Sequence, residues 1–463
     1  MTSPRPSRLA LASLGLTGAL ALTATTALVV PAISDSAYAE TGFVVDEEQV
    51  ASIDHLPGHE GSDLRTGVEG GAGYRIEVPE NWNGTLVLYA HGYRGNVPRL
   101  TVDAPPNRQD LLDRGYAWAA SSYSTNGYDV GTAVKDTRAL QRLFDREVAK
   151  PDRTYVMGVS MGGHVTGVYA EKYHSKVDGA LPFCGALGAR ELPAYLTSNS
   201  LVAQTLAGID TLSQEYPATS GYYTSTLPEL REHFGGGTTT DPDTGATVFA
   251  DLTEHGEKLR AVVEHMSGGE RPLFEMAYEK QWNDFLIQQL RTDPDFGFGT
   301  ESVVDNTDLV YQLDRDPALS DEEVELNENV LRVAGDPKDA PGHPEVTGDL
   351  RVPTISTHDI GDLFVPFSME QYYAQDAADH GKSDLLVSRA IRSISHCGFY
   401  PAEYTAALDD LDEWVDGGEK PDGDDILDPE TVAAEDFGMD HSVVLRPYDP
   451  LYDPETPDFK PAD

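Results

Sequence analysis

The stretch TYVMGVSMGGHVTG, residues 154–167, decides which fold this sequence specifies. It begins with an apolar run of strand length, passes through Gly158, Ser160 and Gly162, and ends in a helix-compatible segment. A serine in G-x-S-x-G between a strand and a helix is typical of a sharp turn that exposes a nucleophile. Small residues are needed there because larger ones would clash with the adjoining strand and helix. We therefore predict that Ser160 is a nucleophile; an ordinary strand-to-helix turn is the alternative.

The pattern on both sides of this turn alternates between strands and helices. Short apolar runs predict strands at 74–78, 85–90, 117–121, 154–158, 177–183, 352–356 and 385–394. Helices are predicted at 110–114, 130–148, 161–172, 369–380 and 400–415. Such alternation gives βαβ units, so we predict an α/β fold with a mostly parallel central sheet flanked by helices.

The alternation stops between residues 185 and 350. This segment is acidic and mainly helix-prone, with helices expected at 201–212 and 273–290 and a loop at 235–245. The residues before the first predicted strand, 40–71, are polar and are expected to be irregular. The predicted organisation is a signal peptide (1–39), a core in two parts (40–184 and 351–420), a large inserted segment (185–350) and an acidic C-terminal tail (421–463) that follows the surface.

The N-terminal residues predict export. Arg5 and Arg8 precede a long apolar run, and Ala37 and Ala39 supply the small residues that a signal peptidase recognises. A membrane anchor is the alternative, since the run is close to spanning length. We expect cleavage, a secreted protein that starts near Glu40, and no membrane association afterwards.

The two cysteines and the charge fit an exported protein. Cys184 and Cys397 are expected to form one disulfide, as cysteine pairs outside the cell commonly do, with two separate buried thiols as the alternative. The chain holds 78 Asp and Glu against 33 Lys and Arg, a formal net charge of −45. Such a surface repels nucleic acid. It indicates solubility in a salty medium or, alternatively, attraction of a cationic partner.

A nucleophilic serine needs a base and an acid that orients the base. In this kind of fold they follow the serine in the order acid, then histidine. His396 lies after the last predicted strand, where ligands bind in parallel sheets. Asp359 and Asp362 both lie on the loop after the preceding strand, and we prefer Asp362 because it comes directly before the next element.

Backbone amides are expected to stabilise the oxyanion. The amide of Met161 starts the helix after the serine, and Gly92 and Tyr93 follow a predicted strand in a loop whose glycine lets amides approach the substrate. A simple strand-ending turn is the alternative for that loop. No histidine pair has metal-ligand spacing and no glycine-rich nucleotide motif is present, so we expect no metal and no cofactor.

These motifs together resemble the α/β-hydrolase superfamily. The matching segments are AHGYRG (90–95), GVSMGG (158–163), DLFVP (362–366) and SHCGF (395–399), and the resemblance covers about 74–185 and 352–417. It implies the α/β-hydrolase fold, with the insertion at 185–350 as a mainly helical lid that covers the site and sets substrate choice.

A looser resemblance is to secreted tannase and feruloyl-esterase-like enzymes. These have a cysteine after the catalytic histidine, bonded to one directly before the serine. Cys397 matches the first, but Val159 stands where the second would be. Cys184 ends the neighbouring predicted strand, and a bond from it to Cys397 would hold the loop that carries His396 beside the serine turn.

We therefore predict a secreted serine hydrolase that cleaves small-molecule or polymeric carboxylic esters with Ser160, His396 and Asp362. An exopeptidase of the same fold, cleaving aminoacyl or prolyl amides, is the first alternative. A non-catalytic binding protein on a hydrolase scaffold is the second.

Overall fold

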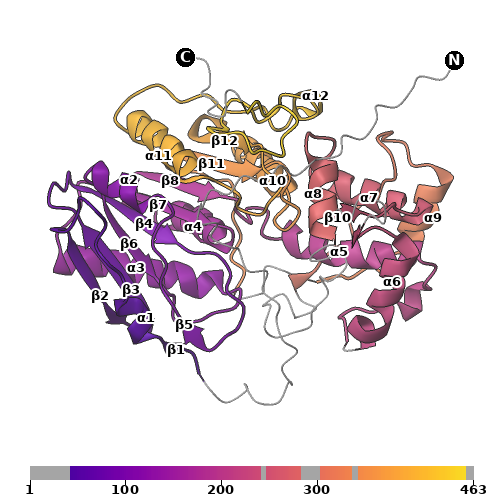
Figure 1. Ribbon diagram of the computed structural model, residues 1–463, viewed down its shortest axis with the longest axis horizontal. Coiled ribbons are helices and arrows are strands. Elements are labelled where there is room, and N and C mark those ends of the chain that lie inside the picture. The colour runs from indigo at the N-terminus through magenta and orange to yellow at the C-terminus, as the bar shows by residue number, and fades with distance from the viewer. Residues whose placement is uncertain (1–41, 220, 241–246, 283–302, 336–341, 455–463) are drawn as a thin grey trace. The chain divides into compact units, whose positions relative to one another are not determined.

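The centre of the protein is an eight-stranded sheet in the order β12-β11-β8-β7-β4-β6-β3-β2 (Figure 1). β3 runs antiparallel to both of its neighbours, and every other neighbouring pair in the sheet is parallel. This computed structural model describes residues 42–219, 221–240, 247–282, 303–335 and 342–454. The strands are β2 (Asp63–Glu69), β3 (Ala72–Val78), β4 (Thr85–Ala90), β6 (Ala117–Ser121), β7 (Arg153–Val159), β8 (Gly179–Phe183), β11 (Thr354–Asp359) and β12 (Leu386–Ile391). The order is that of the α/β-hydrolase fold, so the predicted fold class is confirmed.

The middle strands are apolar throughout because both faces of the sheet are covered. In β4, Leu86 and Leu88 pack into one core, while Val87 and Tyr89 pack into the other. This follows from the two-residue period of a strand, which sends successive side chains to opposite faces. The first core also contains apolar side chains of α3 (Val130–Glu147), α4 (Met161–Lys172) and α10 (Ser368–Asp379); the second contains those of α2 (Arg108–Asp113) and α11 (Pro401–Val415).

In the part of the segment between β8 and β11 that the structure describes, helices predominate over strands, as predicted. Its described helices are α5 (Glu191–Leu206), α6 (Leu227–Phe234), α7 (Glu254–Met266), α8 (Phe274–Gln281) and α9 (Asp321–Asn329), which lie beside the sheet in Figure 1. The helix predicted at 201–212 begins ten residues earlier and ends at Leu206. Around the predicted loop, β9 (Thr238–Thr240) pairs with β10 (Thr247–Phe249), and residues 241–246 lie outside the described residues. Residues 283–290 of the other predicted helix also lie outside them.

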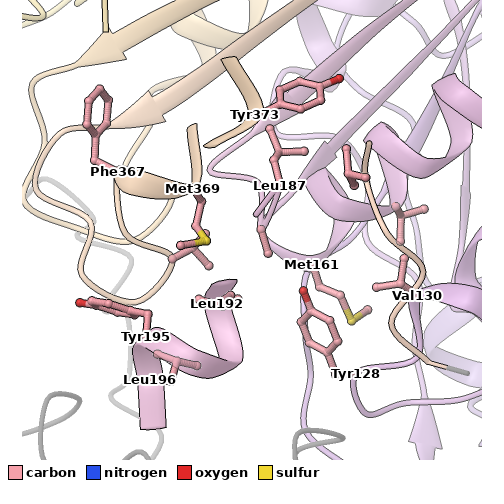
Figure 2. Close-up of a cluster of buried hydrophobic side chains, with 14 of the residues drawn as sticks. Tyr128, Val130, Met161, Leu187, Leu192, Tyr195, Leu196, Phe367, Met369 and Tyr373 are labelled. Atoms are coloured by element: carbon pink, nitrogen blue, oxygen red, sulfur yellow. The ribbon is translucent and has the colours of Figure 1, made fainter. Parts of the chain in front are cut away.

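The inserted helices share a hydrophobic core with the sheet domain. Leu192 and Tyr195 of α5, Met161 of α4 and Met369 of α10 belong to one buried cluster, drawn in Figure 2. The described residues from Gly42 onwards form one compact unit. The division at residues 184 and 350 into core and lid stays a prediction.

The N-terminal part of the chain is more regular than predicted. Residues 40–71 contain the short strand β1 (Val44–Val45), which pairs with β5 (Arg99–Leu100), and α1 (Glu47–Ala51), besides the edge strand β2. β2 escaped the sequence pattern because an edge strand with solvent-facing charges and Gly67 lacks a clean apolar alternation. The predicted signal peptide, 1–39, lies outside the described residues. No helix among the described residues has the length and apolar character needed to cross a bilayer.

The C-terminal tail is also more closely packed than predicted. α12 (Pro429–Val432) lies within it, and Asp424 accepts a hydrogen bond from the backbone amide of Ala390 in β12 at 2.7 Å. Arg392, directly after β12, forms a fully buried ion pair with Asp449. The tail is therefore part of the folded structure at this edge of the sheet.

The turn between β7 and α4 is packed against the end of β4 with no space for larger residues. A Cβ atom added at Gly162 would lie 2.1 Å from the carbonyl oxygen of Ala90, and one at Gly158 would lie 2.2 Å from that of Gly162. The obstacle in both cases is backbone, which cannot move aside as a flexible side chain can. The glycines thus allow α4 to start directly beside the end of β4.

We predict that Gly162→Ala lowers the free energy of unfolding by about 3 kcal/mol, the upper range for overpacking a tight site. Gly42→Ala is the matched control, because a Cβ at Gly42 meets nothing within 4 Å. Urea denaturation of both variants measures the difference. Equal midpoints for the two variants would contradict this account of the turn.

Candidate active site

Ser160 lies in the sharp turn between β7 and α4. It has φ 57° and ψ −122°, a strained conformation for a residue with a side chain. Its amide donates to the carbonyl oxygen of Phe183 at 3.0 Å and approaches the sulfur of Cys184 at 3.3 Å. Its carbonyl accepts from Gly163 at 2.8 Å. The strained conformation is therefore held from both the sheet and the helix.

A chain of hydrogen bonds joins Ser160, His396 and Asp362. The Ser160 hydroxyl lies 2.8 Å from Nε2 of His396 and can donate to it, and Nδ1–H of His396 donates to Oδ2 of Asp362 at 2.6 Å. Ser160 and Asp362 are buried, and the His396 side chain is about a quarter exposed, at 26%. The structure brings together the three residues that the sequence selected, and this geometry lets the imidazole take a proton from the serine.

The two candidate acids differ in their surroundings. Oδ1 of Asp362 accepts hydrogen bonds from the amides of Phe364 and Val365, at 2.8 and 3.1 Å, while Oδ2 faces His396. Asp359 accepts one, from the amide of Gly398 at 2.9 Å. Burial, helped by the neighbouring charge of Asp362, raises the pKa of Asp359 to about 7. The preference for Asp362 over Asp359 agrees with this geometry.

Buried His358 lies close to Asp362, with its Nε2 atom 3.9 Å from Oδ2 of the aspartate. His358 donates from Nε2 to the carbonyl oxygen of Val365 at 2.8 Å, and its other ring nitrogen lies 3.7 Å from Glu370 of α10. Glu370 accepts a hydrogen bond from Ser356 at 2.6 Å. These contacts tie Val365, on the loop that carries Asp362 (the acid loop), to β11 and α10.

The predicted oxyanion loop lies against the serine. A Cβ atom added at Gly92 would lie 3.2 Å from Cβ of Ser160, a tight contact that glycine avoids. Buried His91 holds the loop by donating from Nδ1 to the carbonyl of Gly92 at 2.7 Å, and burial lowers its pKa to about 3. Met161 is the first residue of α4, where amides have no partner within the helix. The roles of the Met161 and Tyr93 amides stay predictions.

Cys184 and Cys397 form a disulfide. Cys184 follows β8, and Cys397 follows His396, so the bond ties the histidine loop to the strand beside the serine turn. The bond closes a loop of 213 residues. In the chain-entropy model such a loop stabilises the fold by about 5 kcal/mol.

The two sulfurs and His396 also form the group of potential metal ligands found among the described residues, with their ligand atoms within 4.8 Å of one another. The sulfurs are bonded to each other, and a metal needs thiolates. This group does not fit a metal ion.

The inserted segment contacts both loops of the site. The side-chain amide of Gln281 in α8 donates to the carbonyls of Gly361 and Ile394 and accepts from the amide of Leu363. Arg271 is buried and precedes α8 in the sequence, and its guanidinium donates to the carbonyl of Ile360 at 2.5 Å. Sequence patterns gave no sign of these residues, because the contacts join positions about 80 or more residues apart.

Comparisons with known proteins give distant likenesses. The chain is 24% identical over 410 residues to an o-phthalyl amidase of Xanthobacter agilis, across 76% of this chain and 86% of that protein. No protein-family model matches.

Two solved structures carry names from the group that the sequence resembles. Feruloyl esterase B from Aspergillus oryzae is 16% identical with a TM-score of 0.41, over 76% of this chain and 80% of that one. The tannin acyl hydrolase of Aspergillus niger is 14% identical with a TM-score of 0.41, over 78% and 79%. The strand order, rather than these likenesses, establishes the fold.

We predict that Asp359→Asn makes the protein more stable than the wild type above pH 7. The pKa of Asp359 is about 7 in the folded state and near 4 when unfolded, so between these values only the folded state keeps the proton. Raising the pH through this window therefore costs the wild type up to about 4 kcal/mol, and asparagine, which can still accept from Gly398, removes the loss. Unfolding curves at pH 5 and pH 8 measure it; parallel changes in the two proteins would contradict the assignment.

Proposed function

We propose that the chain, which has the α/β-hydrolase fold, is a hydrolase that cleaves carboxylic esters through an acyl-enzyme formed on Ser160. The observation that carries this proposal is the hydrogen-bonded series Ser160, His396, Asp362 at a strained strand-to-helix turn. A strained turn of this kind has a functional explanation, since a serine hydroxyl held beside a base is the arrangement that nucleophilic catalysis needs.

In the proposed reaction, Oγ of Ser160 attacks the acyl carbon while Nε2 of His396 takes its proton. The imidazolium then donates that proton to the leaving alcohol, and water attacks the acyl-enzyme by the same route. Asp362 accepts from Nδ1 and stabilises the imidazolium, while the two amides on its other oxygen keep it oriented. The amides of Met161 and Tyr93 would bind the oxyanion beside Gly92.

Amide cleavage is the second candidate. The same series of residues can open an amide, because His396 can protonate an amine as it would an alcohol. The observation in favour is the likeness to the o-phthalyl amidase, a relative named for an amide substrate. An aromatic acyl group with a nearby carboxylate is the substrate class that this name suggests.

A non-catalytic binding protein is the third possibility. Binding proteins on enzyme scaffolds need no hydrogen-bonded nucleophile, base and acid. Keeping all three at 2.6–2.8 Å, with the serine in a strained conformation, argues against this role.

We predict that Ser160→Ala abolishes labelling by a fluorophosphonate probe and lowers turnover of aryl esters at least about 10⁴-fold. The fold should remain, as thermal unfolding can verify. Continued labelling of this variant would rule out Ser160 as the nucleophile.

The two acids provide a matched pair. Asp362→Asn should lower turnover about 10⁴-fold, because the amide disfavours the imidazole tautomer that the reaction needs. Asp359→Asn, three residues away, should change turnover less than about tenfold, since its side chain accepts from Gly398 rather than His396. Similar losses in the two variants would contradict the assignment of Asp362.

Ester and amide cleavage can be separated with acetyl, feruloyl and phthalyl groups, each as an aryl ester and as the matched anilide. The leading proposal expects kcat/KM for each ester to exceed that of its anilide by far more than their difference in spontaneous hydrolysis. A preference confined to phthalyl anilide would support the amidase instead.

A further inference from the structure

His396 lies on a loop, residues 392–400, between β12 and α11; we call it the histidine loop. A loop residue does not hold catalytic geometry by itself, because its backbone lacks the regular hydrogen bonds of a helix or strand. The disulfide and Asp362 hold the loop from the serine side. Residues 435–449, near the C-terminus, also contact the loop; we call them the C-terminal clamp.

The clamp contacts the first residue of the loop, Arg392, through both the side chain and the backbone amide of this arginine. This guanidinium donates to both oxygens of Asp449, at 2.7 and 3.0 Å, and to the carbonyls of Glu435 and Phe437. The backbone amide of Arg392 donates to the hydroxyl of Ser442 at 2.9 Å. Arg392 is 1% exposed and the side chain of Asp449 is fully buried. A buried, two-pronged ion pair with additional hydrogen bonds has one favourable geometry, so it fixes the position of the chain.

Two more clamp residues bracket His396 itself. The hydroxyl of Tyr448 accepts from the amide of Ile394 at 3.2 Å, two residues before the histidine. Arg446 donates to the carbonyl of Gly398 at 2.7 Å, two residues after it. Arg446 in turn is held by both oxygens of buried Glu403, at 2.7 and 2.8 Å. Glu403 lies in the first turn of α11, so Arg446 ties the loop to this helix.

The clamp therefore contacts the loop on both sides of His396 without contacting the reacting atoms. Arg392, Arg446 and Asp449 are buried, and the contacts of Tyr448 with Ile394 and of Arg446 with Gly398 are partly buried. Moving the loop would leave the buried groups unpaired, at a cost of about 1–3 kcal/mol for each. That cost opposes any displacement of the imidazole from Ser160. A displacement of about 1 Å can lower the rate about 100-fold.

We propose that the C-terminal clamp positions His396, with Arg446 and Tyr448 as positioning residues for the proposed reaction. The inference rests on the proposed role of His396, and it gives the acidic tail a function beyond covering the surface.

The first test is Tyr448→Phe. It keeps the ring and removes only the oxygen that accepts from Ile394. We expect kcat on an aryl ester to fall about three- to tenfold, with KM within about twofold, because ground-state binding does not use His396. The pH profile of kcat/KM should shift on its acid limb, since the imidazole and Asp362 no longer meet in the same geometry.

The second test is the double variant Arg446→Met/Glu403→Gln. It removes the bond to Gly398 without leaving a buried charge unpaired. We expect kcat to fall about 30- to 100-fold with KM little changed. Rates are expressed per active site, counted by titration with a fluorophosphonate, so that unfolded protein does not contribute.

Asp428→Ala is the control. Asp428 caps α12 in the same tail and contacts neither Ile394 nor Gly398. It should lower the melting temperature and leave kcat per site unchanged. If Tyr448→Phe and the double variant behave like this control, the clamp is structural only and the proposal is overturned. His396→Ala separates the two hypotheses: full activity in that variant would overturn the proposed function, whereas inactivity with unaffected clamp variants would overturn the clamp alone.

Discussion

The contact between Gly162 and the carbonyl of Ala90 is the constraint on which the rest of the site depends. It brings the first turn of α4 directly beside the end of β4, at a distance that no side chain would allow. Ser160 is thereby forced into a left-handed backbone conformation, with its side chain against Gly92. The energy stored in that turn must be offset elsewhere, and the large buried core on both faces of the sheet provides the stabilisation.

The other two members of the hydrogen-bonded series come from loops, and each loop is held by residues remote in sequence. Gln281 bridges the acid loop and the histidine loop from the inserted segment. The disulfide reaches the histidine loop from β8, and the C-terminal clamp reaches it from the end of the chain. In a chain with a net charge of −45, buried arginines give carboxylates fixed partners; Arg392 is the first residue of this loop and Arg446 contacts it. The inserted segment, the end of β8 and the C-terminal clamp thus all contribute contacts that hold the histidine loop in place.

Two carboxylates three residues apart illustrate how surroundings rather than sequence assign roles. Asp362 accepts two amides on one oxygen and an imidazole N–H on the other, so both oxygens have partners and one faces His396. Asp359 accepts one amide in a buried position beside Asp362, and its pKa rises accordingly. Of the two carboxylates, Asp362 hydrogen-bonds His396 whereas Asp359 hydrogen-bonds the amide of Gly398, so their contacts rather than their residue type separate their roles.

The sequence by itself determined the strands of the sheet other than β2, the serine turn, and the three residues of the hydrogen-bonded series, Ser160, His396 and Asp362. These follow from local patterns: apolar runs of strand length, glycines around Ser160, and an acid and a histidine each at the end of a strand. It did not reveal β2, whose edge position leaves a mixed pattern, nor the ends of α5. It also did not reveal Gln281, Arg446 or Tyr448, because their contacts join positions far apart in the chain. Periodicity and turn chemistry act over a few residues, whereas a hydrogen bond between Arg446 and Gly398 exists only after the whole chain has folded, and only the tertiary structure could decide it.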